Sequence, residues 1–333
     1  MKFGPTPIGE AEGAVLAHAV RTGGIALKKG EILTRERQVA LAEAGVTSIV
    51  AARLEPGDVG EDEAARNLAK RLAGAHLRCA PAFTGRVNLF AEIAGLAIID
   101  AEAVDRVNAV DEGITVATLP PYRVVADGDM VATVKIIPFA IPSSALEAAL
   151  TLSPAEAITV RPFKPMRIGV VSTTLPSLKA STVAKTLRVL EARLAPTGAR
   201  VVAQEVVPHE VQPLAKALAK LIDGSDALIA FGASAITDRR DVIPAAVEAI
   251  GGRIERFGMP VDPGNLLLLA ERQGMPIIGA PGCARSPKEN GFDWVLQRVL
   301  AGVPIRDADI RAMGLGGLLM EISTRPQPRA PDD

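Results

Sequence analysis

The second half of this sequence predicts an α/β fold, a three-layer and mostly parallel sheet, and the first half predicts a second, smaller α+β domain. From Arg167 onward, short apolar runs alternate with segments of helical periodicity. These runs lack polar alternation, which is typical of parallel strands buried between two layers of helices. A chain of 333 residues is also longer than one hydrophobic core usually organises, so two domains are expected.

The first domain is expected to span residues 1–155 and to mix short helices with β-rich stretches. A helix and then a strand are predicted within residues 31–49, where helical spacing gives way to Gly45 and a β-branched run. A second helix is predicted over 61–75 and a strand pair over 114–141. The pattern favours a packing or dimerisation domain over an independent active site, and its role stays open.

A connector is predicted between residues 152 and 166, where three prolines interrupt any periodicity. The second domain is expected over 166–303, and residues 304–333 are expected to form a C-terminal extension or the start of a linker. This extension ends in the Pro-rich, charged sequence RPQPRAPDD.

The second domain alternates strands with helices. The first helix is expected to use Ser181 or Thr182 as its N-cap, and the third carries Pro244 in its first turn. The leucine run after the Pro263-Gly264-Asn265 turn is expected to be core, as a helix or an extended segment. Predicted strands cover 167–173, 199–208, 226–234 and 275–282, and predicted helices cover 181–195, 210–222, 241–252 and 288–302.

Composition excludes several classes of function. Aromatic residues make up 3% of the chain and its formal net charge is -1, so neither base stacking nor a general attraction to nucleic acid is expected. Two cysteines and three scattered histidines offer no zinc-ligand spacing. No secretory signal is visible, and no apolar run approaches the ~20 residues that span a bilayer. We expect a cytoplasmic protein without a membrane partner.

Three predicted loops contain the unusual residues, and all three follow predicted parallel strands. Because ligands of such sheets bind at the carboxyl ends of the strands, these loops form the candidate site. Each residue also has a plain structural interpretation: hydroxyls cap turns, and Asp241 can cap a helix. The candidate ligand-binding residues are Thr173, Thr174, Gly232, Ser234, Asp241, Asn265, Gly282, Ser286 and Lys288.

Small residues at Gly232 and Gly282 permit a ligand to approach the backbone closely. Ser286, Lys288 and Asn290 precede a helix whose N–H groups are expected to receive a phosphate. These features together predict a site for an anionic, polar small molecule.

At these loops the sequence resembles the molybdopterin-binding domain family of molybdenum cofactor biosynthesis. The resemblance covers residues 167–302 and rests on AFGAS at 230–234, on Arg240-Asp241-Val242-Ile243-Pro244 and on Ala280-Pro281-Gly282. It is closest to a subgroup in which this region precedes a domain similar to molybdenum cofactor cytidylyltransferases. The chain has no Gly-rich LAAGxSxRMG-type loop, so cytidylyl transfer is not expected here.

Two departures from the family pattern bear on catalysis. The family's double glycine is Gly232-Ala233 here, which adds a methyl group beside the ligand. Adenylylating members carry Pro-Asp-Glu after their second strand, where this chain has Pro208-His209-Glu210. An imidazole in place of that carboxylate removes a hard oxygen ligand, which magnesium prefers.

The resemblance implies three alternatives. The first is a module that binds molybdopterin or the molybdenum cofactor and presents it to a nucleotidyltransferase, a molybdoenzyme or a chaperone. The second is a transferase that adenylylates molybdopterin or inserts molybdenum, with magnesium and a nucleotide as cofactors and with Asp241 and Asp238 as catalytic and metal-binding residues. The third is a different ligand on the same scaffold. Self-association into a homo-oligomer is implied by likeness alone.

Overall fold

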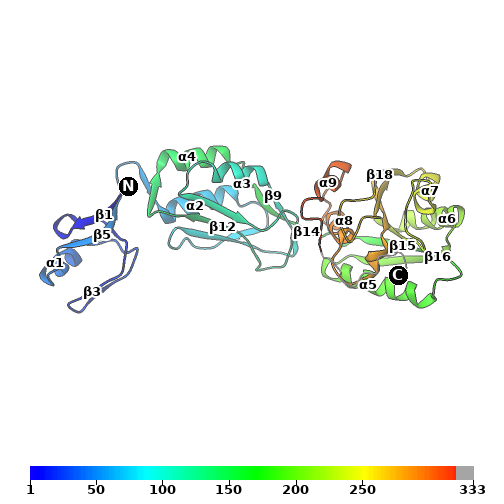
Figure 1. Cartoon of the computed structure of the whole chain (residues 1–333), viewed down its shortest axis with the longest axis horizontal. Helices are drawn as coiled ribbons and strands as arrows, with labels where there is room; N and C mark the ends of the chain where they lie inside the picture. The colour runs from blue at the N-terminus through cyan, green and yellow to red at the C-terminus, as the bar shows by residue number, and fades with distance from the viewer. Residues whose placement is uncertain (320–333) are drawn as a thin grey trace, which may run out of the picture. The chain divides into compact units, whose positions relative to one another are not determined.

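The computed structural model describes residues 1–319 of the chain. By its contacts, the chain divides into two compact units, residues 1–161 and 162–333 (Figure 1). This division falls inside the stretch 152–166 in which the sequence predicts a connector. The possible linker sequence RPQPRAPDD lies outside the described residues.

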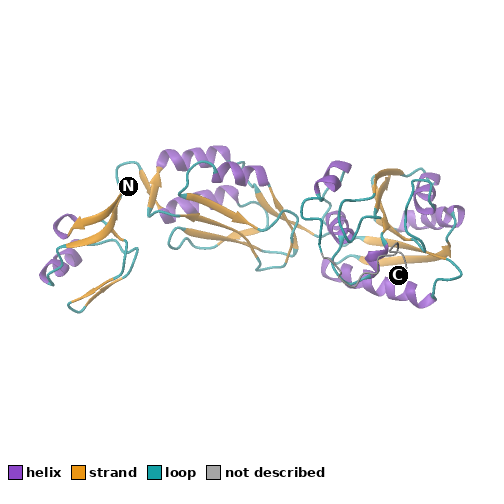
Figure 2. Cartoon of the chain, viewed as in Figure 1, coloured by secondary structure: helices purple, strands orange, loops and turns teal. Residues whose placement is uncertain are grey.

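The first part of unit 1 is a small antiparallel sheet with the α-helix α1 and the short 3-10 helix η1 (Ile8–Glu10) (Figure 2), and it has its own apolar core. Thr34 caps the helix by accepting a hydrogen bond from the backbone N–H of Arg37. The strands pair in the order β1-β5-β2, and β3 and β4 form a separate hairpin. The elements are β1 (Lys2–Pro7), β2 (Val15–Leu16), β3 (Val20–Thr22), β4 (Ile25–Leu27), α1 (Arg35–Glu43) and β5 (Ser48–Arg53).

The rest of unit 1 surrounds a second apolar core and has α+β character, as predicted. Its largest sheet has the order β10-β12-β8-β7, and the predicted strand pair over 114–141 is the antiparallel pair β10 and β12. The elements are β6 (Asp58–Gly60), α2 (Glu61–Leu72), β7 (Leu77–Cys79), β8 (Arg86–Ala91), β9 (Gly95–Ile99), α3 (Ala101–Asn108), β10 (Ile114–Thr118), β11 (Val124–Val125), β12 (Met130–Ile136), β13 (Ala140–Pro142), α4 (Ser143–Leu152) and β14 (Ile158–Pro162).

Unit 2 is an α/β domain built on a mostly parallel sheet of order β16-β15-β17-β20-β19-β18, in which β19 runs antiparallel to both neighbours. The predicted fold class of this region is therefore confirmed. The elements are β15 (Arg167–Thr174), α5 (Ala180–Leu194), β16 (Arg200–Pro208), α6 (Val211–Leu221), β17 (Ala227–Phe231), α7 (Val242–Ala249), β18 (Arg253–Phe257), β19 (Leu268–Arg272), β20 (Met275–Ala280), α8 (Gly291–Leu300) and α9 (Asp307–Ala312).

Helices cover both faces of this sheet. On one face α5, α8 and α9 contribute Leu190, Phe292 and Ile310 to one core. On the other face α6 and α7 contribute Leu218 and Val247 to a second core. Strands that meet a helical layer on each side lose contact with water on both faces, which explains their wholly apolar sequences.

Two details differ from the sequence-based predictions, and the structure decides between the two alternatives for the leucine run. Helix α5 starts at Ala180, so Ser181 and Thr182 lie inside its first turn, and the N-cap Lys179 makes no side-chain cap. The leucine run becomes the strand β19, in a hairpin with β20. The predicted extension contains α9, whose Ile310 packs into the core of unit 2, so residues 304–312 are part of the folded domain.

Among residues 1–319, no helix combines the length and apolarity that crossing a membrane requires.

Candidate functional site

The topology of unit 2 has one switch point, between β15 and β17. The chain leaves β15 through α5 to β16 on one side, and returns through α6 to β17 on the other. Ser172 of β15 pairs with Phe231 of β17, and Phe231 pairs with Ala280 of β20. The carboxyl ends of these three parallel strands therefore lie side by side. The three predicted loops therefore lie along one edge of the sheet, which we call the carboxyl edge, where ligands of such folds bind.

Thr173 organises the centre of the carboxyl edge. Its side chain is fully buried, and its Oγ1 accepts a hydrogen bond of 2.8 Å from the backbone N–H of Ala233. The same Oγ1 lies 2.8 Å from Nδ1 of His209, the first residue after β16. One hydroxyl thus joins the ends of β15, β16 and β17.

Replacing Thr173 with Val is expected to lower the free energy of unfolding of unit 2 by about 1–3 kcal/mol, because the buried N–H of Ala233 loses its acceptor while the shape of the side chain is kept. Urea unfolding followed by the fluorescence of Trp294, the only Trp of the chain, measures this change. The matched control is Thr174→Val, since Thr174 is only half-buried and bonds Val207 O at 3.3 Å. Equal stability of the two variants would contradict the role given to Thr173.

Gly232 allows a close approach of two backbone segments at this edge. A Cβ atom there would lie 2.6 Å from the backbone oxygen of Ser234 and 3.1 Å from the side chain of Ile243 at the start of α7. The imidazole of His209 lies 3.8 Å from the same point. Only a glycine fits, as the sequence predicts for this loop, although the close neighbours are the protein's own atoms.

Asp241 acts as the N-cap of α7. Its Oδ1 accepts from the backbone N–H of Val242 at 2.8 Å, and its Oδ2 accepts from that of Thr237 at 3.2 Å. Asp238 is exposed and accepts hydrogen bonds from Arg240, which lower the pKa of Asp238 to about 2. Both side chains thus already accept hydrogen bonds from N–H donors.

Asp238 and Asp241 are the two carboxylates that the transferase alternative assigns to a magnesium ion. Within residues 1–319, no group of three or more His, Cys, Asp and Glu side chains is arranged to hold a metal. Magnesium requires oxygen ligands in near-octahedral geometry, often with bound phosphates. A magnesium ion held by these aspartates would therefore take its remaining ligands from a bound phosphate or from water.

The third loop, residues 281–290, is held by Arg193 of α5. The Arg193 guanidinium donates to Asp293 Oδ1 at 2.5 Å, to Ala284 O at 2.9 Å and to Ser286 O at 2.6 Å, and both charged side chains are about nine-tenths buried. A fourth, longer bond reaches Lys288 O at 3.3 Å. Ser286 and Lys288 are therefore fixed through their backbone oxygens.

The expectation that a phosphate binds the N-terminus of α8 is wrong. Asn290 caps this helix by accepting from the N–H of Phe292, and its backbone oxygen accepts from Asp293. The N–H of Gly291 donates to Pro263 O. The first three N–H groups of the helix already have acceptors, so they offer no vacant donor to an anion.

The remaining predicted residues take separate positions. Ser234 is exposed in the loop after β17, and Gly282 begins the short helix η4 (Gly282–Arg285) that follows β20. Asn265 is exposed in the turn before β19, where its amide donates to Met259 O at 3.4 Å. This turn contacts the start of α8, because a Cβ atom at Gly264 would lie 2.9 Å from Gly291.

Arg285 is a residue of this edge that the sequence does not single out. Its guanidinium donates to Gly232 O at 2.7 Å and to Thr186 Oγ1 of α5 at 2.8 Å, and it lies over the ring of Phe231. Burial lowers the pKa of Arg285. No carboxylate within residues 1–319 forms an ion pair with it, and a half-buried cation without a counterion is suited to an anionic ligand.

Residues 168–302 match the family described as "Probable molybdopterin binding domain". This match lies within unit 2. The family domain covers β15 to α8 and so includes the whole carboxyl edge. Residues 5–53 match a separate family, described as "Domain of unknown function (DUF8806)". None of the curated proteins matches the chain.

Among solved structures, the chain is similar to a molybdopterin biosynthesis MoeA protein from Pyrococcus horikoshii, with 12% identity over 91% of this chain and 76% of the other, at a TM-score of 0.31. The MoaB enzyme of molybdopterin biosynthesis from Thermus thermophilus matches with 19% identity over 42% of this chain and 98% of its own, at a TM-score of 0.32. At these identities and TM-scores, neither likeness bears on the chemistry of the family domain.

Proposed function

We propose that the carboxyl edge of the family domain binds molybdopterin, or its molybdenum-loaded form, and presents it to a nucleotidyltransferase or to an acceptor molybdoenzyme. The observation that carries this proposal is the guanidinium of Arg285, which lies without a carboxylate partner among the described residues at the switch point of a domain that matches this family. Molybdopterin is a phosphate monoester, and a phosphate is the counterion that this guanidinium lacks.

The remaining contacts follow from the positions of the three loops. Two of the five N–H donors of Arg285 bond Gly232 and Thr186, which leaves donors for two phosphate oxygens. We assign the hydroxyls of Thr174 and Ser234 to the same site, because these residues lie at the ends of β15 and β17 on the carboxyl edge. The pterin ring is rich in N–H donors, and we propose that Asp241 and Asn265 accept from it, Asp241 through the second lone pair of an oxygen that already caps α7.

The side chains at the carboxyl edge favour a site that binds the pterin without converting it. The imidazole of His209 follows β16, where adenylylating members of the family carry an aspartate by resemblance, and Asp238 is paired with Arg240. Chemistry at the pterin phosphate would then be supplied by the partner. A cytoplasmic setting and self-association of the chain are parts of the same proposal.

The test is a titration of the full chain with molybdopterin under anaerobic conditions, followed by addition of ATP and Mg²⁺. We expect saturable binding of one pterin per chain and no release of pyrophosphate. Pyrophosphate release that disappears in Asp241→Asn would show a transferase instead. Absence of saturable binding would refute the proposal and leave a different ligand on the same scaffold.

A further inference from the structure

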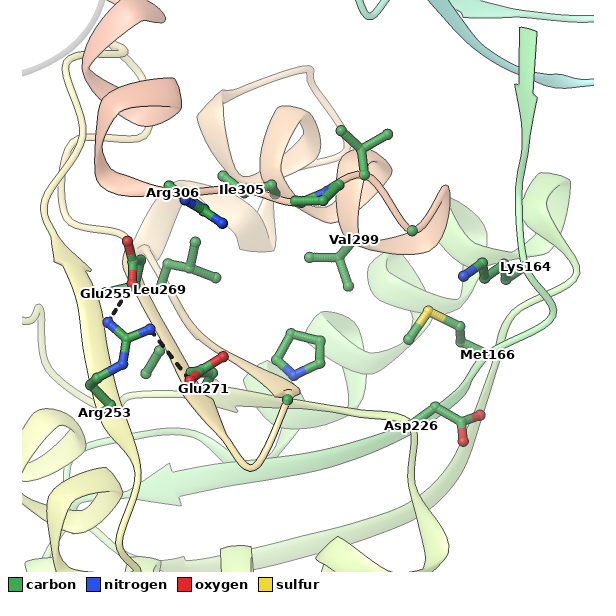
Figure 3. Close-up of a pocket in the computed structure, with 16 residues that line it drawn as sticks. Lys164, Met166, Asp226, Arg253, Glu255, Leu269, Glu271, Val299, Ile305 and Arg306 are labelled. Atoms are coloured by element: carbon green, nitrogen blue, oxygen red, sulfur yellow. Dashed lines mark hydrogen bonds and ion pairs between the residues drawn. The ribbon is translucent and has the colours of Figure 1, made fainter.

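A cavity of about 720 Å³ lies in unit 2 at the opposite edge of the sheet from the candidate site (Figure 3). It is lined by residues at the starts of β15, β17 and β20, among them Met166, Asp226 and Pro276. The end of α8 and the following segment close its other side with Val299 and Ile305. None of the residues predicted from the sequence as site residues lines this cavity. Its volume is in the range of small-molecule sites.

Each acidic group of the cavity forms an ion pair with a neighbouring arginine, and Glu255 and Glu271 share Arg253. Arg253 bonds Glu255 at 2.6 Å and Glu271 at 3.3 Å, as the dashed lines in Figure 3 show. Asp226 pairs with Arg167 at 2.9 Å. The backbone N–H of Asp307, and then Arg253, lower the pKa of Glu255, and Arg167 lowers the pKa of Asp226, so both carboxyl groups already have hydrogen-bond donors.

Two cations of the cavity have no such partner. Lys164 and Arg306 line it, and neither forms an ion pair with a carboxylate within residues 1–319. Figure 3 shows them on different sides of the cavity, with Val299 between them. The lining therefore combines an apolar wall with two cations that form no ion pair within residues 1–319.

We propose that this cavity is a second binding site, for an amphipathic organic anion whose apolar body packs on Leu269, Val299 and Ile305 and whose carboxylate or phosphate is bound at one end of the cavity, by Lys164 or by Arg306. Apolar surface supplies the affinity for such a ligand and a few charged groups fix its orientation. A cationic ligand is disfavoured, because each carboxylate of the lining is already paired. The proposal is independent of pterin binding, since the two sites lie at opposite ends of the strands.

The experiment uses 8-anilino-1-naphthalenesulfonate, an aromatic sulfonate that becomes fluorescent in apolar sites, titrated into the full chain. We expect octanoate or octyl phosphate to displace the bound probe, and the stronger of the two competitors identifies the preferred head group. The double variant Lys164→Ala/Arg306→Ala is expected to weaken probe binding by about five-fold or more. The matched control is Lys216→Ala/Arg188→Ala, which removes the same charges from exposed positions outside the cavity and should leave the affinity unchanged.

A second variant tests the apolar wall. Ile305→Asp places an unpaired carboxylate in the cavity and should reduce probe binding by about ten-fold. Unchanged affinity in both the double variant and Ile305→Asp, or failure of both competitors to displace the probe, would overturn the proposal. Because Lys164 and Arg306 are exposed, the double variant remains informative if Ile305→Asp does not fold. Pterin titration of the same variants should give the wild-type result, which separates this proposal from the proposed function.

Discussion

Replacement of Arg193 with Met is expected to lower the free energy of unfolding of unit 2 by about 3–5 kcal/mol. The substitution leaves Asp293 as an unpaired carboxylate in the core, where only 9% of its side chain is exposed. It also removes the donors that hold Ala284 O and Ser286 O. Trp294 follows Asp293 in α8, so its fluorescence during urea unfolding reports directly on this region.

Two further variants separate the charge from the geometry of Arg193. Arg193→Lys keeps the charge, but an ammonium cannot span Asp293 and two carbonyl oxygens at once, so an intermediate loss is expected. The double variant Arg193→Met/Asp293→Leu removes both charges and should recover part of the stability. A stability of Arg193→Met within about 0.5 kcal/mol of the wild type would contradict the role of this residue, since such changes are typical of surface substitutions.

Replacement of Arg285 with Met is expected to weaken binding of the phosphorylated pterin by roughly 10- to 100-fold, which corresponds to the ~1.5–3 kcal/mol of a hydrogen bond to a charged group. Affinity for the dephosphorylated pterin should stay close to that of the wild type, because the proposed contact is to the phosphate alone. Binding titrations with the two forms measure both values.

Arg285 also bonds Gly232 O and Thr186, so its replacement could disturb the loop itself. Comparing the phosphorylated with the dephosphorylated pterin distinguishes this structural effect from the loss of a phosphate contact. If the guanidinium only supports the loop, Arg285→Met will weaken both pterins equally. Arg285→Lys should keep part of the preference for the phosphorylated form, since an ammonium supplies the positive charge but not the planar, bidentate donor geometry of a guanidinium. The exposed Arg188 of α5 provides the control Arg188→Met, which should change neither affinity.

The parallel part of the sheet could be predicted because strands that are buried on both faces have wholly apolar sequences. The segments that became β15, β17 and β20 are runs of apolar residues followed by Gly, Pro or hydroxyl residues. Since parallel strands end at a common edge, the positions of Thr173, Gly232 and Gly282 followed from the order of elements alone. Strand β18 was missed, because in RIERF the polar Arg253 and Glu255 alternate with half-buried residues over only five positions.

The contacts that organise the site could not be predicted, because they join residues far apart in the chain. Arg193 and Asp293 are separated by 100 residues, and Arg285 and Gly232 by 53. Nothing in the local sequence distinguishes these arginines from solvated ones. For the same reason the N-terminus of α8 was expected to be open to an anion, whereas Asn290 and Pro263 supply its acceptors.

The most direct test of the central claim is the pterin content of the full chain purified from a host that makes molybdopterin. Oxidation converts bound molybdopterin to a fluorescent derivative that can be quantified per chain. We predict a substantial fraction of one pterin per wild-type chain, a strongly reduced content in Arg285→Met, and none in protein from a host blocked before molybdopterin synthesis. Wild-type protein that carries no pterin and takes up none when molybdopterin is added would contradict the account.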